Sequence, residues 1–244
     1  MSARTAVWLA CALAACAEPG LARIEVKPNV TGLRAGETYA YVVRAGDDVV
    51  LVGSGSDKTG RELLLGLGEL GLSPEAVDLV LLPTTHAAHA GGAHLFTQAR
   101  VVVGDGDDAL LSRDRMPRAY EAWIAARTGK SPPVPATLVR ALPGERFVIG
   151  ALTVDVVATP GVSPGSLCFV VDRVAFVGDA LAVHGNTLAL PSRWRAESPS
   201  LLAKVIARLG QAPFDTLVDA RGGSLTEAWS AVTSVASRAQ GAQR

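Results

Sequence analysis

The chain has 244 residues, of which 49% are hydrophobic and 19% are charged, and its Lys+Arg and Asp+Glu totals are both 23. This length suits one large α/β domain, and the apolar content is ample for a core, which excludes a largely disordered chain. The balanced charge argues against nucleic acid as a partner, because phosphate binding needs concentrated positive charge.

Residues 1–16 have the pattern of an export signal. Arg4 is followed by an apolar run at 6–13, which is too short to span a bilayer, and then by small residues. The sequence Leu-Ala-Ala-Cys at 13–16 resembles a bacterial lipobox, in which the cysteine becomes the lipidated first residue of the mature protein. We therefore expect an exported protein of the cell envelope, anchored to a bacterial membrane through a lipid on Cys16. Ordinary cleavage after Ala17, which would give a periplasmic or secreted protein, stays open as the alternative.

The remaining chain is interpreted as a tether and first-strand approach at 17–37, with 18–28 irregular, and a single domain at 38–240. In chain order we predict strands at 38–43 and 48–53, a helix at 61–70, strands at 79–82 and 100–103, a helix at 120–127, a Pro-rich connector at 131–135, two short strands within 146–158, a hairpin of strands at 167–171 and 174–177, a helix at 198–209, a strand at 216–218 and a closing helix. The helix at 61–70 rests on leucines at helical spacing, and the closing helix on a capping box of Ser224 and Glu227. Residues 104–108 are interpreted as a solvated acidic turn, because they lack the ligand series of a calcium loop.

The most informative segment follows the strand at 79–82. It reads Leu-Leu-Pro-Thr-Thr-His-Ala-Ala-His-Ala-Gly-Gly at 81–92, so two histidines three residues apart precede a Gly-Gly turn. The segment resembles the Thr-His-x-His-x-Asp-His-x-Gly-Gly loop of the metallo-β-lactamase superfamily. With the Gly-Gly pair as the anchor, His86 and His89 match the second and third histidines of that loop. Thr84 stands in place of the first histidine, and Ala88 in place of the aspartate.

Four further motifs carry the same resemblance in the family's order, and the resemblance covers about residues 39–229. Thr-Pro-Gly-Val-Ser-Pro-Gly-Ser at 159–166 resembles the family's Thr-Pro-Gly-His-Thr-Pro-Gly-Ser, with Val162 in place of the ligand histidine. Phe-Val-Gly-Asp at 176–179 keeps the aspartate that bridges the two metals, as Asp179. The late Gly-His-Gly loop corresponds to 218–222, with Arg221 in place of the last histidine. An early Gly-Ser-Gly turn at 53–55 matches a family turn whose aspartate is replaced.

The resemblance implies a four-layer αββα sandwich with metal-binding loops at one edge of its two sheets. It also implies which ligands remain: His86 alone at the first metal, and His89 with Asp179 at the second. Because catalytic zinc normally has three protein ligands and an open position for water, we expect no metal cofactor. Zinc at low occupancy, held by a contracted site of His86, His89 and Asp179, stays open, and His94 and His184 are more distant candidate ligands.

These losses favour a protein that no longer performs zinc hydrolysis, whose remnant cleft binds a small molecule or is vestigial. The alternative is a hydrolase with one metal, acting on an ester, lactone, thioester or phosphodiester through His86, His89 and Asp179. A structural or interaction domain is a third reading. We further hypothesise that Arg221 takes the place of the second metal by pairing with Asp179, since an unpaired buried carboxylate is costly.

Overall fold

The computed structural model describes residues 22–111, 133–192 and 195–241. The export signal, the helix predicted at 120–127 and the first two residues of the Pro-rich connector lie outside these ranges. Among the described residues, no helix is long and apolar enough to cross a membrane.

The first sheet has seven strands within the described ranges, in the order β1-β2-β3-β4-β5-β6-β7. They are β1 (Arg23–Lys27), β2 (Val30–Ala35), β3 (Thr38–Ala45), β4 (Asp48–Val52), β5 (Leu79–Leu81), β6 (Arg100–Gly104) and β7 (Leu138–Ala141). Strands β1 to β4 are antiparallel, and β4 to β7 are parallel. Parallel neighbours need crossover connections, and helix α1 (Arg61–Glu69) is the crossover from β4 to β5.

The second sheet has the order β15-β14-β11-β10-β9-β8 in the described part of the chain. Its strands are β8 (Arg146–Ile149), β9 (Leu152–Ala158), β10 (Leu167–Val171), β11 (Val174–Phe176), β14 (Thr216–Val218) and β15 (Ser224–Thr226). A separate hairpin joins β12 (Ala182–His184) to β13 (Thr187–Ala189). The helices of this half are α5 (Pro199–Val205), continued by the 3-10 helix η3 (Ile206–Gln211), and α6 (Ala228–Gly241).

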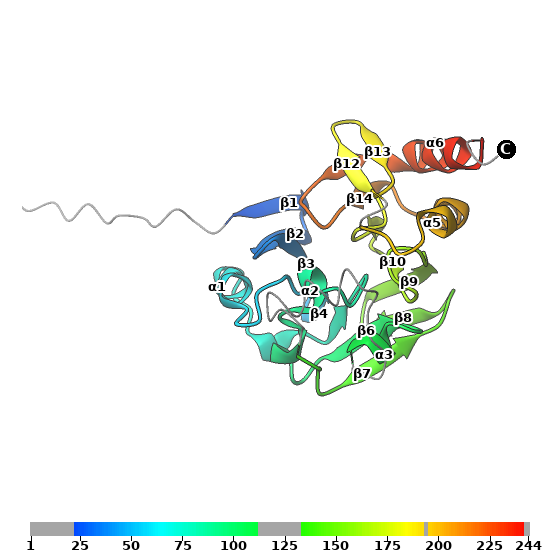
Figure 1. Cartoon of the computed structure of the whole chain (residues 1–244). Coiled ribbons are helices and arrows are strands. Elements are labelled where there is room, and N and C mark those ends of the chain that lie inside the picture. Colours follow the sequence, from blue (N-terminus) through cyan, green and yellow to red (C-terminus); the bar gives the residue numbers. More distant parts are fainter. Residues whose placement is uncertain (1–21, 112–132, 193–194, 242–244) are drawn as a thin grey trace, which may run out of the picture.

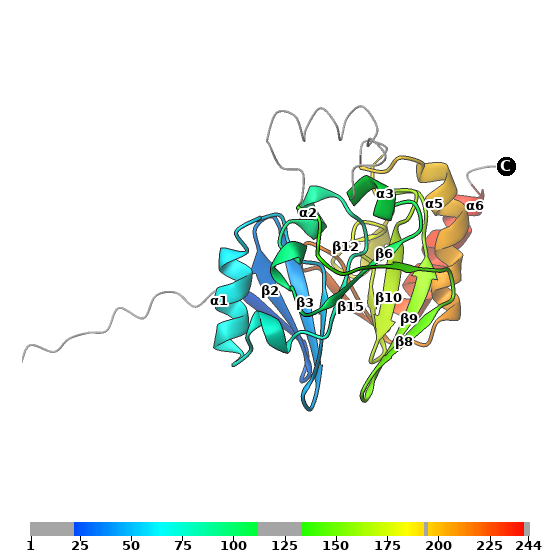
Figure 2. The same ribbon diagram turned by 90° about the horizontal axis from the view of Figure 1, so that it is seen from below.

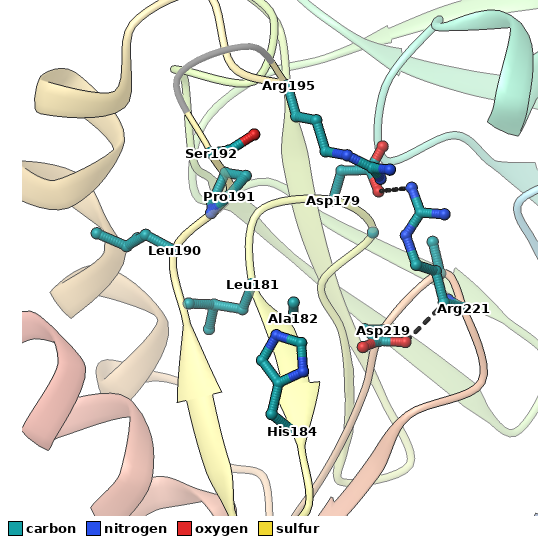
Figure 3. Close-up of a pocket in the computed structure, with 12 residues that line it drawn as sticks. Asp179, Leu181, Ala182, His184, Leu190, Pro191, Ser192, Arg195, Asp219 and Arg221 are labelled. Carbon is teal, nitrogen blue, oxygen red and sulfur yellow. Dashed lines mark hydrogen bonds and ion pairs between the residues drawn. The ribbon is translucent and has the colours of Figure 1, made fainter.

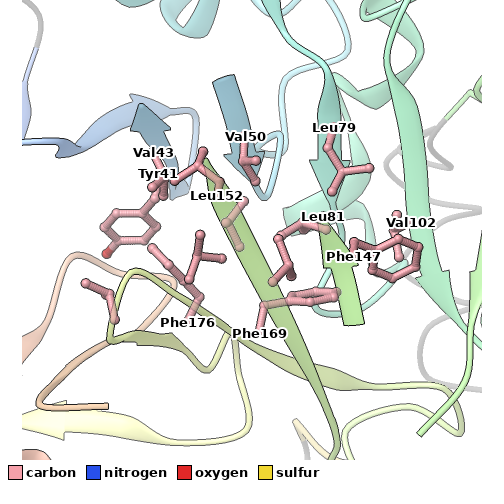
Figure 4. Packing of buried hydrophobic residues seen from close by; sticks show 14 of the residues in the cluster. Tyr41, Val43, Val50, Leu79, Leu81, Val102, Phe147, Leu152, Phe169 and Phe176 are labelled. Atoms are coloured by element: carbon pink, nitrogen blue, oxygen red, sulfur yellow. The ribbon is translucent and has the colours of Figure 1, made fainter. Parts of the chain in front are cut away.

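The two sheets face each other, with α1 on the outer side of the first sheet and α5 and α6 on the outer side of the second (Figures 1 and 2). Three apolar clusters fill the three interfaces of these layers. The central cluster includes Tyr41 and Leu81 from the first sheet and Phe169 and Phe176 from the second (Figure 4). The predicted αββα sandwich is therefore confirmed.

The alternation of side chains along each strand explains why one strand serves two interfaces. On β10, Phe169 and Val171 point to the central cluster, whereas Cys168 and Val170 point to the cluster beneath α5 and α6. Successive side chains of a strand lie on opposite faces, so a run that is apolar at every position is buried on both sides. Full burial of a side chain such as Phe169 contributes about 2–3 kcal/mol.

Three sequence predictions are wrong. The tether proposed at 18–28, and with it the domain start at 38, fails because Arg23–Lys27 pairs with β2 as an edge strand. The capping box fails because Ser224 is the first residue of β15 and Glu227, with φ 52°, stands between that strand and the first residue of α6. The acidic turn is not solvated throughout, because Asp107 is 0% exposed. Strands β1, β2, β7, β12, β13 and β15 were not predicted. The strands at 167–171 and 174–177 are confirmed, apart from residue 177.

Candidate functional site

The site residues lie on loops that gather at one edge of the sandwich. His86 and His89 follow β5, Asp107 follows β6, and Asp179 and Arg221 follow β11 and β14 respectively. These strands are parallel to a neighbour, so the loops after their carboxyl ends meet at the same edge. This is the edge at which the family resemblance places the metal loops.

The Gly-Gly turn fixes the histidine loop by close backbone packing. A Cβ on Gly91 would lie 2.7 Å from the carbonyl oxygen of Gly55, so only glycine fits there. The loop at 53–56 holds the short helix α2 (Ala87–Ala90) in return, because the backbone N–H of Ser54 donates to the carbonyl of His89 at 2.7 Å, and its hydroxyl does so at 2.9 Å. Backbone packing alone therefore accounts for the Gly-Gly turn, independently of what the histidine side chains bind.

His89 and Asp179 are brought into direct contact. Nε2 of His89 lies 3.0 Å from Oδ2 of Asp179, and their side chains are 2% and 15% exposed. Gly178 permits this approach, because it has φ 55° and a Cβ there would lie 2.6 Å from Cβ of Pro83. The glycine before the aspartate in this motif is therefore needed for the backbone conformation that places Asp179 against His89.

The Asp179 carboxylate is held in its ionised form. Burial would raise its pKa, but the charge and hydrogen bond of His89, followed by the charges of His86 and Arg195, outweigh burial and lower the pKa to about 2. His86 therefore lies close enough to act on Asp179 through its charge. The group carries a stable negative charge in a largely desolvated position.

Arg221 pairs with this carboxylate, as the sequence hypothesis states. Its Nη2 lies 3.6 Å from Oδ1 of Asp179, and its side chain is 46% exposed (Figure 3). The guanidinium comes from the loop after β14, the segment that carries the last histidine in the family motif. The ion pair thus joins Asp179, which matches the family's bridging aspartate, to Arg221, which stands where the family has a ligand histidine.

Asp219 positions the loop that carries Arg221. Its carboxylate accepts hydrogen bonds from the backbone N–H groups of Val183, Arg221 and Gly223, each at 2.8 Å. Burial, which is the largest influence, raises its pKa. Sequence reasoning missed this residue, although its place directly after a buried strand was a usable signal.

The first metal site of the family is replaced by hydrogen bonds and apolar packing. The hydroxyls of Thr84 and Ser163 are 3.1 Å apart, and both residues are buried. Val162 is 1% exposed and packs in the apolar cluster that also contains Leu202 of α5. Ala88 provides only its backbone carbonyl, which accepts from the hydroxyl of Thr38 at 2.6 Å.

Asp107 links three loops at this edge. Its Oδ2 accepts from the hydroxyl of Ser163 at 2.7 Å and from the N–H and hydroxyl of Thr85 at 3.1 and 3.3 Å, while its Oδ1 accepts from the N–H of Gly165 at 2.8 Å. It thereby joins the loop after β5 to the loop between β9 and β10 from its own position after β6. The hydrogen bonds of this carboxylate hold the three loops together, as coordination to shared metal ions would.

The donor set does not fit the zinc pair that the family resemblance implies. His89 and Asp179 engage each other, Thr84 engages Ser163, and Val162 offers no donor. Arg221 adds a positive charge where a metal ion would add another, and like charges repel strongly in a partly desolvated site. Among the described residues, no group of three or more His, Cys, Asp or Glu side chains is arranged to hold a metal ion.

The two distant histidines do not complete a metal site. His94 lies on the 3-10 helix η2 (Ala93–Leu95), and its Nδ1 is buried without a hydrogen-bond partner among the described residues. His184 is exposed on β12 and lines a cavity of about 320 Å³ beside Asp179. The remaining lining residues in the described part of the chain are Gly178, Leu181, Ala182, Leu190, Pro191, Ser192, Arg195, Asp219, Ala220 and Arg221 (Figure 3).

Comparison with known proteins agrees with this architecture. A family model for the metallo-beta-lactamase superfamily matches residues 33–238. The crystal structure of the metallo-β-lactamase SMB-1 bound to 2-mercaptoethanesulfonate superposes with a TM-score of 0.71 at 16% identity, covering 90% of this chain and 95% of that one. A metallo-β-lactamase from Cronobacter sakazakii with a HARLDQ motif gives 0.68 at 16%, covering 91% and 92%. A B3 metallo-β-lactamase with an active-site glutamic acid gives 0.69 at 21%, covering 91% and 89%. No curated protein sequence is a significant match.

The hydrogen bonds of Asp107 predict a large effect of its removal. Asp107→Ala leaves two backbone N–H groups and a serine hydroxyl without their buried acceptor, and we expect a loss of about 3 kcal/mol or more in the free energy of unfolding. Urea denaturation measures it. The matched control is Asp105→Ala, because the Asp105 side chain is 65% exposed and is expected to contribute ~1 kcal/mol or less. Equal losses in the two variants would contradict the structural role of Asp107.

The ion pair between Arg221 and Asp179 predicts energetic coupling. In a double-mutant cycle of Arg221→Ala and Asp179→Asn, we expect a coupling energy of about 0.5–1 kcal/mol, because the guanidinium is partly solvated. Arg100→Ala replaces Arg221→Ala in the control cycle, since Arg100 is exposed at the start of β6, at the opposite end of that strand from the site. Denaturant unfolding gives all the values. A coupling indistinguishable from that of the control cycle would refute the pairing.

Proposed function

The chain belongs to the metallo-β-lactamase superfamily, and we propose that it is a non-hydrolytic member whose remnant cleft binds a small molecule. The observation that carries this proposal is the replacement of metal ligands by contacts within the protein. A guanidinium pairs with the bridging aspartate at 3.6 Å, and a hydrogen-bonded threonine stands where a ligand histidine is expected. Of the other replaced ligand positions, Val162 lies in the apolar core, and Ala88 contributes only its backbone carbonyl.

The chemistry of zinc hydrolysis explains why these substitutions matter. A metal lowers the pKa of its bound water and so supplies hydroxide at neutral pH, which requires about three protein ligands and an open position. Here the imidazole of His89 and the carboxylate of Asp179 are in contact with each other, and a cation adjoins the carboxylate. The cavity of about 320 Å³ beside them is still large enough for a small ligand.

The second candidate is a hydrolase with one metal, acting on an ester, lactone, thioester or phosphodiester. It is favoured by the 3.0 Å contact between His89 and Asp179 and by the charge of His86, which acts on the same carboxylate. In this reading the metal would have to bind in competition with Arg221. Metal content separates the two candidates.

We also propose that the protein is exported and anchored to a bacterial membrane through lipidated Cys16. The support is the apolar run at 6–13 followed by Leu-Ala-Ala-Cys at 13–16, a sequence with the outline of a lipobox. An anchored binding domain would present its cleft at the cell envelope.

Zinc analysis tests the proposed function. We expect the chain purified without added zinc to hold less than roughly one tenth of an equivalent, because its donor set lacks three free ligands. More than about half an equivalent, lost in His86→Ala or His89→Ala, would favour the one-metal hydrolase instead. A combined Arg221→His and Ala88→Asp variant is expected to take up about one equivalent, since it removes the cation and restores four donors. Its matched control combines Arg221→Gln with Ala88→Asn, which changes the same positions but adds only weak ligands.

The lipid anchor is tested in a bacterial host. We expect the chain to incorporate radiolabelled palmitate and to need detergent for extraction, and Cys16→Ser to abolish the label, because the thiol is the acylation site. Cys11→Ser is the control, since it changes a neighbouring cysteine of the same segment. Absence of label from the unchanged chain would favour processing by ordinary cleavage, and label that persists in Cys16→Ser would place the lipid on another residue; either result overturns lipidation at Cys16.

A further inference from the structure

The cavity beside Asp179 has a polar wall and an apolar wall. Arg195 and Arg221 reach towards Asp179 on one side, and Leu181, Leu190 and Pro191 line the other (Figure 3). Its volume of about 320 Å³ is at the lower end of the range for small-molecule sites. The site therefore suits a compact ligand with one polar end.

The charged groups of this cavity differ in their accessibility. Asp219 is 4% exposed, and its two oxygens accept three backbone N–H groups. The Asp179 side chain is 15% exposed and engaged by His89. By contrast, the Arg221 side chain is 46% exposed, and Arg195 is exposed as well. An entering molecule meets guanidinium donors before it meets either carboxylate.

Both guanidinium groups keep donors for a ligand. Arginine has five N–H donors, and the ion pair of Arg221 with Asp179 joins only Nη2 to one oxygen at 3.6 Å. Arg195 acts on Asp179 through its charge and not through a hydrogen bond to it. The planar fork of a guanidinium matches the two oxygens of a carboxylate.

We propose that this cavity binds a small organic monocarboxylate with a short apolar body. Its carboxylate lies against the guanidinium groups of Arg195 and Arg221, and its apolar part packs on Leu181, Leu190 and Pro191. Two arginines and two aspartates make the lining formally neutral apart from His184, so one added negative charge is tolerated better than the two of a phosphate. The inference rests on the proposed function, because a metal ion at Asp179 would compete with Arg221 for that carboxylate.

Hexanoate is the probe for the first experiment, with 1-hexanol, hexylamine and inorganic phosphate as comparators. Titration calorimetry uses the mature chain after its zinc content has been measured. We expect saturable binding of hexanoate, and binding of each comparator weaker by about tenfold or more, because the alcohol and the amine lack the charge that a guanidinium pairs with. Equal binding of hexanoate and hexanol would overturn the proposal, since it would assign the affinity to the apolar wall alone.

Variants locate the carboxylate. Arg195→Gln and Arg221→Gln are each expected to weaken hexanoate binding by about tenfold, whereas Arg100→Gln leaves it unchanged. Arg195→Gln is the decisive variant, because that side chain is exposed and its replacement by another polar residue is expected to leave the fold intact. Undiminished binding in both site variants overturns the proposal. A zinc-free chain without hexanoate binding overturns this inference alone, whereas a chain with stoichiometric zinc overturns the proposed function and this inference together.

Discussion

The buried charge of Asp179 is the constraint that organises this site. Its side chain is 15% exposed and its pKa is lowered to about 2, so it requires cationic partners in the folded state. An unpaired carboxylate in such a position costs several kcal/mol, so the aspartate is compatible with a stable fold only where positively charged or hydrogen-bonding partners adjoin it. His89 is the nearest of these partners, at 3.0 Å, and Arg221 adds a guanidinium at 3.6 Å from a loop whose backbone is fixed by Asp219.

The loops at this edge face a second requirement, since in the family the metal ligands come from separate loops and so hold them together. Here a single buried carboxylate does this work, because Asp107 accepts hydrogen bonds from the loop after β5 and from the loop between β9 and β10. The threonine and serine hydroxyls add a further contact across the same gap. The edge is therefore tied in two places, by an ion pair near Asp179 and by a hydrogen-bonded network at Asp107, and a cavity lies beside the former.

The sequence could predict the sandwich and the replaced ligand positions, because both depend on local order along the chain. Apolar runs such as β10 mark doubly buried strands, and fixed motif spacing identifies Val162 and Arg221. The role of Asp107 could not be predicted, because its partners Thr85, Ser163 and Gly165 lie on loops distant in sequence and an acidic residue in a turn is typical of a solvated turn. Asp219 carried a usable signal, since it directly follows a buried strand. Strand β1 was missed for a related reason: its mixed, partly exposed residues show no burial pattern, and pairing with β2 alone makes it a strand.

The motif residues that match the family and those that differ obey different physical demands. Gly91 and Gly178 are required by backbone packing, since any side chain there would lie within 2.7 Å of a neighbouring atom. The ligand positions carry no such demand, because a threonine fits into a hydrogen-bonded network at 84 and a valine into an apolar cluster at 162. The glycine motifs therefore predict the backbone conformation of these loops. The chemistry of the site depends instead on the side chains at the ligand positions. The cavity in this protein is lined by the guanidinium groups of Arg195 and Arg221 beside the carboxylates of Asp179 and Asp219, and the two guanidinium groups are the ones on which the proposed binding of a carboxylate depends.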